Sequence, residues 1–281
     1  MGEGVIPEPQ RTYVLELLYA LGPAADDFVV AGAQAMKFMV ERARATKDID
    51  FVLDVVRLRG EPLALAAELE RLGYTAVEGS RNFQFEKPIP NGAETMRIEF
   101  MAPEEFKREK DFRVDVQNGV HARACTGGAI ALAQSEIHEL SGRLPDGSKF
   151  AASIRVTKPH ALVMLKLLAL DDRYRNIRGP AEARHDREEA RTHAADIVAI
   201  VSAQPELATF REAFRRQFGS DHALGERATG ILREYFRDNL SPGLLVYEEF
   251  LVANRPLDRN VRVEVAEELE RARKLMSTAG A

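Results

Sequence analysis

The spacing of apolar residues changes once along the chain, near residue 157. Before that point, short runs that alternate apolar and polar residues predict strands, whereas after it apolar residues recur every three or four positions, as on helices. Strands are expected near 27–31, 48–54, 74–78, 82–87 and 96–101, with short runs over 111–124 and a hairpin turning at 144–148. The pattern predicts an α+β fold, a small mixed sheet with helices in domain 1–157 and a helical domain 158–281.

Helices are expected at 11–21 and 61–72 in the first half. From Pro159 onward the helical segments, separated by Pro or Gly signals, are 187–203, 206–218, 222–238, 242–253 and 261–276. The stretch 173–191 is dense in Arg, Asp and Glu and contains Gly179-Pro180. We expect a mobile loop there, which either serves as a lid or is simply solvated.

The most informative segment runs from Gly32 to Asp50. A helix is expected from Gln34 to about Arg42, and the strand that follows carries Asp48 and Asp50. Alternate side chains of a strand point to the same face, so the two carboxylates project together. Two acids beside a helix N-terminus indicate a site for Mg²⁺ and a triphosphate. The alternative is a solvated strand end, since short motifs also match by accident.

Two segments resemble motifs of polymerase-β-type nucleotidyltransferases, and more narrowly the AbiEii-like branch of abortive-infection and toxin–antitoxin systems. The first comprises Val30-Ala31-Gly32-Ala33-Gln34-Ala35 and Arg44-Ala45-Thr46-Lys47-Asp48-Ile49-Asp50-Phe51. In that branch a Gly-Gly or Gly-Ser turn precedes Arg-x-Thr/Ser-x-Asp-x-Asp. The second, Lys166 to Arg173, resembles the later helix Lys-x-x-Ala-x-x-x-Arg. The resemblance covers residues 26–200 and implies a nucleotidyltransferase-like fold.

The resemblance implies a reaction in which an acceptor hydroxyl attacks the α-phosphorus of an NTP and pyrophosphate leaves. Two Mg²⁺ or Mn²⁺ ions can clamp the attacking and leaving oxygens, and carboxylates hold them. Asp48 and Asp50 are then the first two metal ligands. The third is expected from a neighbouring strand, where Glu99 shares a face with Arg97. Glu99 would also accept the proton of the acceptor, and its alternative is a solvated strand residue.

The resemblance assigns nucleotide binding to Gly32, Ala33, Gln34, Arg44, Thr46, Lys166, Arg173 and Asp196. Lys166 lies in an apolar helical run with Arg173 on the same face, and two cations suit a triphosphate. Alternatively, Lys166 extends from its helix into solvent. Asp196 either orients Lys166, pairs with Arg173 or is an ordinary surface residue. Ala33 replaces the usual Gly or Ser, and His193 stands where an acid is usual.

Composition excludes several classes of protein. The 281 residues carry a net charge of −5, so the whole chain is not a general nucleic-acid binder. The Arg-rich clusters at 211–216 and 271–274 are expected to be solvated helix faces, with RNA contact as the alternative. The single cysteine, Cys125, rules out a disulfide framework and a cysteine zinc site, and we expect it to be packed. No transmembrane or leader segment is visible, which predicts a cytoplasmic protein without membrane contact.

Three functions remain open. The favoured one is a metal-dependent nucleotidyltransferase that moves an NMP from an NTP to a hydroxyl of tRNA or other RNA, a protein or a small molecule. The alternative is a catalytically weak or inactive nucleotide-binding or partner-binding protein of the same fold. The third, compatible with the first, is a toxin whose main output is binding to an antitoxin protein.

Overall fold

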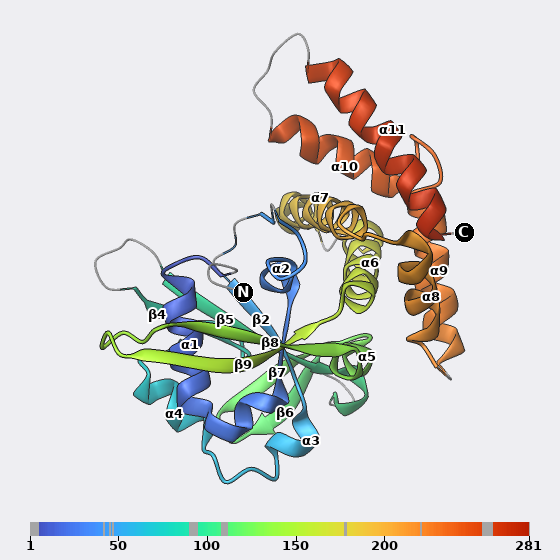
Figure 1. The fold of residues 1–281 in the computed structure, drawn as a ribbon. Coiled ribbons are helices and arrows are strands. Elements are labelled where there is room, and N and C mark those ends of the chain that lie inside the picture. The colour runs from blue at the N-terminus through green and yellow to red at the C-terminus, as the bar shows by residue number, and fades with distance from the viewer. Residues whose placement is uncertain are drawn as a thin grey trace. The chain divides into compact units, whose positions relative to one another are not determined.

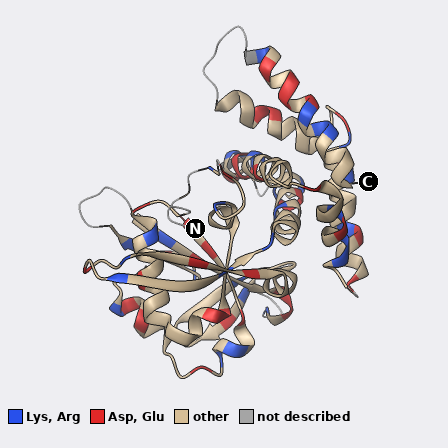
Figure 2. Ribbon diagram, viewed as in Figure 1, with Lys and Arg blue, Asp and Glu red and all other residues tan. Residues whose placement is uncertain are grey.

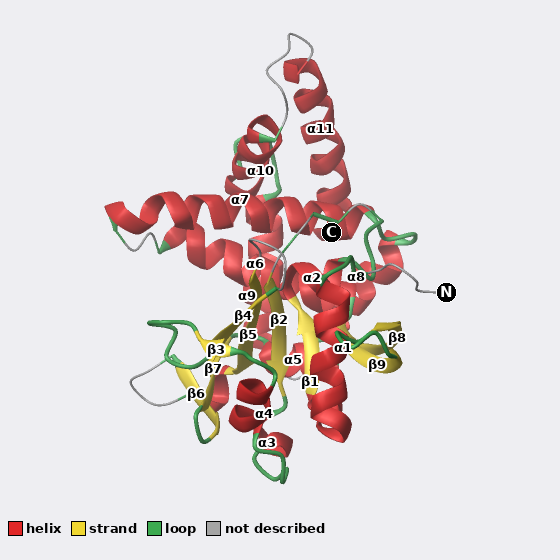
Figure 3. Ribbon diagram, turned by 90° about the vertical axis from the view of Figure 1, so that its left-hand side faces the viewer, coloured by secondary structure: helices red, strands yellow, loops and turns green. Residues whose placement is uncertain are grey.

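The computed structural model describes residues 6–41, 43–44, 46, 48–89, 95–107, 112–176, 179–219, 221–254 and 261–280. The chain divides into two compact units, Met1–Lys158 and Pro159–Ala281. All the strands of the described chain lie in the first unit, and the second consists of helices (Figures 1 and 3). The predicted α+β fold with a mixed sheet is therefore confirmed.

In its described residues, the first unit combines helices with a nine-stranded sheet. Its elements are α1 (Gln10–Leu21), β1 (Phe28–Ala31), α2 (Gly32–Met36), β2 (Asp48–Leu53), α3 (Val55–Leu58), α4 (Leu65–Arg71), β3 (Thr75–Ala76), β4 (Gln84–Pro88), β5 (Thr95–Pro103), β6 (Arg113–Gln117), β7 (Val120–Cys125), α5 (Gly128–Ala133), β8 (Ser135–Arg143) and β9 (Lys149–Thr157). The main strand order is β3-β4-β5-β2-β1-β9-β8, and β7 pairs with β5 and β6. The sheet is mixed because β1 runs antiparallel to β2 but parallel to β9, and β2 runs parallel to β5.

One face of this sheet is an aromatic core. Four buried rings are in contact there, those of Phe28, Phe51, Phe85 and Phe100. Lys87 lies two residues beyond Phe85 on β4 and so shares its face. The Lys87 ammonium nitrogen lies 2.6 Å from the Glu16 carboxylate of α1. Helix α1 therefore covers the aromatic face.

The opposite face carries the polar residues singled out in the sequence. Val29 of β1 pairs with Val52, which lies two residues after Asp50 on β2, so Val29 is on the Asp50 face. Arg155 of β9 pairs with Val29 and donates a hydrogen bond of 2.8 Å to the carbonyl oxygen of Leu132 in α5. Helix α5 therefore packs on the Asp50 side of the sheet.

The second unit contains α6 (Pro159–Arg175), α7 (Pro180–Ser202), α8 (Leu207–Arg216), α9 (His222–Tyr235), α10 (Pro242–Ala253) and α11 (Val261–Gly280). Acidic and basic residues alternate along several of these helices (Figure 2). Many of the charges pair with a residue one turn away, as Arg216 does with Glu212 and Arg273 with Glu270. The Arg-rich clusters are thus balanced by acids on their own helices, as expected for solvated helix faces. Within the described ranges, no helix is both long and apolar enough to cross a bilayer.

The loop predicted over 173–191 is wrong, because helices α6 and α7 occupy most of it. Pro180 stands at the first position of α7, where its missing N–H costs nothing, and Gly179 before it has a φ of +148°. Arg184 pairs with Glu188 along the helix, and Arg187 bonds to Glu249 of α10. Dense charge here reflects paired helix faces rather than a solvated loop.

Two other local expectations also fail. Helix α2 spans only Gly32–Met36, shorter than the helix expected to reach Arg42, and Arg42 itself lies outside the described residues. The helix expected over 61–72 is also shorter, because α4 spans only Leu65–Arg71, and the separate short helix α3 precedes it. The six-residue helix α5 was not anticipated, because one short turn of small apolar residues has no readable period.

Candidate active site

The polar face of the sheet brings the predicted acids together. On the parallel strands β2 and β5, Asp48 pairs with Arg97 and Asp50 pairs with Glu99. Residues paired directly across a ladder lie on the same face, and neighbouring strands are about 4.8 Å apart. Asp48, Asp50 and Glu99 therefore share one face, as the sequence predicted. Asp48 is exposed and Asp50 is half-buried, so the end of β2 faces solvent.

The backbone of Gly32 packs directly against the side chain of Asp50. Ala31, the last residue of β1, pairs with Asp50, and Gly32 follows it with a φ of +60°. A Cβ atom on Gly32 would lie 1.7 Å from Oδ2 of Asp50, well inside any real contact. Only glycine satisfies both the backbone and the space at this position. The turn of the first motif and its second aspartate are thus one packed unit.

Glu99 has protein partners on both carboxylate oxygens. Its Oε1 accepts a hydrogen bond of 2.7 Å from Nε of Arg123 on β7, and its Oε2 accepts one of 2.6 Å from Nε2 of Gln84 on β4. The Glu99 side chain is only 14% exposed, whereas that of Arg123 is 42% exposed. The positive charge beside these carboxylates belongs to Arg123, which the sequence did not single out.

Burial alone would lower the pKa of Arg123, but the charge of Glu99 and its hydrogen bond, with a smaller contribution from Asp50, raise it, and the resulting pKa lies above the ordinary value. Burial raises the pKa of the neighbouring Cys125 thiol to about 11, so this cysteine is neutral at pH 7. Arg123 therefore stays charged in a partly buried acidic setting. In the sequence it was one polar position in the alternating run 111–124, with nothing to mark its partner.

The donor set on this face suits Mg²⁺ in part. Among the residues that the structure describes, no group of three or more His, Cys, Asp or Glu side chains is arranged to hold a metal ion. Asp48 and Asp50 nevertheless lie on one face of β2. Mg²⁺ is commonly bound by one or two carboxylates, with substrate phosphates and water as its other ligands. The residues fit a metal held jointly with a nucleotide. The third-ligand role of Glu99 stays a prediction.

The remaining first-motif residues lie around the start of β2. Gln34 of α2 is completely buried, and within the described chain neither atom of its amide has a hydrogen-bond partner. Ala33 is buried beside it, and Arg44 is half-buried. The Thr46 hydroxyl oxygen accepts a hydrogen bond of 3.3 Å from the backbone N–H of Asp48, which fixes the entry to the strand. The nearby Lys47 lies outside the described residues.

The second unit holds the other predicted residues in buried ion pairs. Lys166 of α6 donates a hydrogen bond of 2.6 Å to Oδ2 of Asp196 on α7, and the two side chains are 6% and 2% exposed. Arg173, two turns further along α6, pairs at 3.0 Å with the fully buried Asp186. Of the alternatives, Asp196 therefore orients Lys166, and Lys166 does not extend into solvent. His193 lies 3.9 Å from Glu189, one turn earlier on α7.

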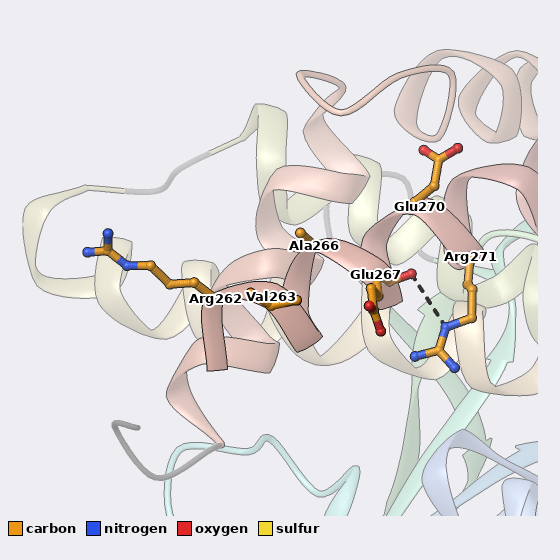
Figure 4. A pocket seen from close by; sticks show the side chains of 6 residues that line it. All are labelled: Arg262, Val263, Ala266, Glu267, Glu270 and Arg271. Carbon is orange, nitrogen blue, oxygen red and sulfur yellow. Dashed lines mark hydrogen bonds between the residues drawn. The ribbon is translucent and has the colours of Figure 1, made fainter. Parts of the chain in front are cut away.

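A shallow hollow on α11 gathers none of these residues. Figure 4 shows its six lining side chains, all from this one helix: Arg262, Val263, Ala266, Glu267, Glu270 and Arg271. The drawn hydrogen bond runs from Nε of Arg271 to the backbone oxygen of Glu267, 3.4 Å away. The hollow lies on a single helix and none of the predicted site residues lines it, so the candidate site stays on the sheet of the first unit.

Comparison with known families gives one match. A family model described as "Nucleotidyl transferase AbiEii toxin, Type IV TA system" matches residues 16–274. The match extends over both units and includes every predicted site residue. No curated protein matches the chain.

Proposed function

The chain belongs to the AbiEii nucleotidyltransferase toxin family of type IV toxin–antitoxin systems, and on that premise we propose that it transfers an NMP from an NTP to a hydroxyl acceptor. In this reaction the acceptor oxygen forms a bond to the α-phosphorus, the bond from that phosphorus to the pyrophosphate oxygen breaks, and the hydroxyl proton passes to a base or to water. The observation that carries the proposal is the packing of Gly32 against Asp50, on the face that Asp50 shares with Asp48.

Asp48 and Asp50 would hold Mg²⁺ or Mn²⁺ together with the nucleotide phosphates. When bound, the metal supplies positive charge that offsets the charge of the phosphate oxygens. Thr46 supports Asp48 by bonding to its backbone, and Gly32 keeps the Asp50 carboxylate in place. We further propose that the buried amide of Gln34 binds a polar group of the nucleotide, since an unpaired buried amide is otherwise costly.

Lys166 and Arg173 are proposed to bind nucleotide phosphates. The same role is proposed for Arg44. The contact with Asp196 fixes the Lys166 ammonium in one position, and Asp186 does the same for Arg173. The acceptor is proposed to be an RNA such as tRNA, a protein or a small molecule. The family description also implies an antitoxin partner for this chain.

The test is incubation of the full chain with each α-³²P-labelled NTP, Mg²⁺ or Mn²⁺ and total RNA. Asp48→Asn and Asp50→Asn are compared with wild type, and Asp146→Asn at the tip of the β8–β9 hairpin is the matched control for the loss of one charge. Label should reach RNA, protein or a small molecule with wild type and with the control, and neither site variant should transfer it.

If wild type transfers no label and calorimetry detects no metal-dependent NTP binding, the proposed function is wrong. NTP binding without any transfer would instead favour the second candidate, a weak or inactive nucleotide-binding protein of this fold. The observations in its favour are Ala33 in place of the usual Gly or Ser and the engagement of both Glu99 oxygens by protein partners.

A further inference from the structure

We infer that Glu99 is a positioning residue for Arg123 rather than a third metal ligand, and that Arg123 supplies to the nucleotide phosphates the charge that a second metal ion would supply. The inference rests on the proposed function and deepens it. It predicts a site with one divalent cation held by Asp48 and Asp50, next to a resident guanidinium.

The contacts of Glu99 are those of a residue that holds an arginine. Nε and Nη2 of Arg123 each lie 2.7 Å from Oε1 of Glu99. The other oxygen, Oε2, is taken by Gln84. The three residues come from three different strands, β5, β7 and β4, so the backbone of the sheet fixes the arrangement. A metal ion at Glu99 would have to displace these partners or approach beside a fixed positive charge.

The exposure of the two side chains fits the same roles. The Glu99 carboxylate is mostly covered, whereas the Arg123 side chain is 42% exposed. A guanidinium has five N–H donors, of which Nε and one Nη2 donor face Glu99. A further contact of 3.5 Å runs from Nη2 to Sδ of Met101. Among the described residues Nη1 has no hydrogen-bond partner, so it remains available to a ligand.

The position of Arg123 on the sheet places it beside the proposed metal ligands. Glu99 pairs with Asp50 on one side of β5, and Arg123 pairs on the other side with Met101, two residues further along. All four side chains lie on one face. The Asp50 charge is also close enough to raise the pKa of Arg123.

The chemistry of arginine suits this place. Its planar N–H groups match phosphate oxygens and form charge-assisted hydrogen bonds. Negative charge builds up on the leaving pyrophosphate during nucleotidyl transfer, and a fixed cation that is already in place stabilises it without reorganisation. A Glu–Arg pair can thus take the place of one carboxylate and its metal ion.

The experiment measures binding on the full chain with two probes, Mn²⁺ alone and Mn²⁺ with inorganic pyrophosphate. Electron paramagnetic resonance counts bound Mn²⁺, and calorimetry measures pyrophosphate affinity. The variants are Glu99→Gln, Arg123→Gln, Arg123→Lys and Asp50→Asn. Arg143→Gln, on the hairpin strand β8, is the matched control for the loss of an arginine.

Wild type should bind one Mn²⁺, and Glu99→Gln should change that affinity by less than about threefold, whereas Asp50→Asn abolishes it. Pyrophosphate affinity should fall about tenfold in Arg123→Gln and in Glu99→Gln, as expected for one charge-assisted contact. Arg123→Lys should restore part of it, which a purely structural arginine would not, and Arg143→Gln should leave it unchanged.

Two bound Mn²⁺ ions, a Glu99→Gln loss of Mn²⁺ as large as that of Asp50→Asn, or unchanged pyrophosphate affinity in Arg123→Gln would each overturn the inference. These results leave the proposed function intact. If Asp50→Asn binds Mn²⁺ as wild type does, the proposed metal site itself fails. The two failures are therefore distinguishable.

Discussion

Replacing Gly32 with alanine tests whether the first motif positions Asp50. The added Cβ atom would lie 1.7 Å from Oδ2 of Asp50, and ordinary contact begins near 3.4 Å. The carboxylate must therefore retreat by about 1.7 Å, or the turn must open by a comparable amount. The substitution also places a side chain at a φ of +60°.

The backbone strain lowers stability, whereas the displacement of the Asp50 carboxylate lowers the rate of transfer, so the two effects are measured separately. A non-glycine residue at positive φ costs about 1–3 kcal/mol of folding free energy. A misplacement of about 1 Å at a reacting centre lowers a rate about 100-fold. We therefore expect Gly32→Ala to lose at least about 100-fold in nucleotide transfer, far more than its stability loss explains.

Gly22→Ala is the matched control, because Gly22 has a φ of +54° and nothing within 4 Å of the Cβ position. Both variants should lower the melting temperature, by about 2–4 °C for each kcal/mol, as measured by circular dichroism. Transfer of label should survive in Gly22→Ala alone. If Gly32→Ala retains transfer within about threefold of wild type, the contact with Asp50 does not position that carboxylate and the reasoning is wrong.

Further predictions concern stability. Lys166→Met and Asp196→Asn should each lower the free energy of unfolding by about 3–5 kcal/mol, because each removes one half of a buried ion pair. The double variant should lose less than the sum in urea denaturation, and additive losses would contradict the pairing. The hydrogen bond from Arg187 is the main cause that lowers the pKa of Glu249 to about 2, from an ordinary value of 4.5. Because the folded pKa is the lower one, this stabilisation is complete above about pH 5 and is lost as the pH falls towards 2. Glu249→Gln should flatten the pH dependence of unfolding in that window, and an unchanged slope would refute the role of the pair. Phe100→Ala should cost about 3–5 kcal/mol, because Phe100 is fully buried among aromatic rings, and an unchanged urea midpoint would contradict that packing.

Local periodicity predicted the parts of the site that lie close together in the chain. The shared face of Asp48 and Asp50 follows from the two-residue repeat of a strand. The alternation around Glu99 likewise predicted a neighbouring strand, and β5 does pair with β2. The Gly32 turn was recognised, but its contact with Asp50 was not, because the register of β1 against β2 is set by the folded sheet.

Partners from distant strands were not predictable from such patterns. Arg123 is 24 residues from Glu99 and Gln84 is 15 residues away, and neither spacing reveals a contact. Charge density predicted a loop at 173–191, but in the sequence alone paired helix faces cannot be told from a solvated loop, and helices α6 and α7 occupy most of this stretch. Lys166 shows the same limit, since the apolar run around it left burial and exposure open, and Asp196 was suggested as its partner by the resemblance and not by the run itself.

The pairing of β1 has a consequence for the order in which this protein is made. Val29 of β1 pairs with Arg155 of β9, and Arg155 also bonds to the backbone oxygen of Asp26, 129 residues earlier. In a chain still emerging from the ribosome, β1 therefore cannot pair with β9 until residues 149–157 have been synthesised. Until then the backbone N–H and C=O groups along one edge of β1 have no strand to pair with, and such edges can pair with strands of other chains. The strand that leads into Gly32 therefore gains its second neighbour only when the whole first unit has been translated.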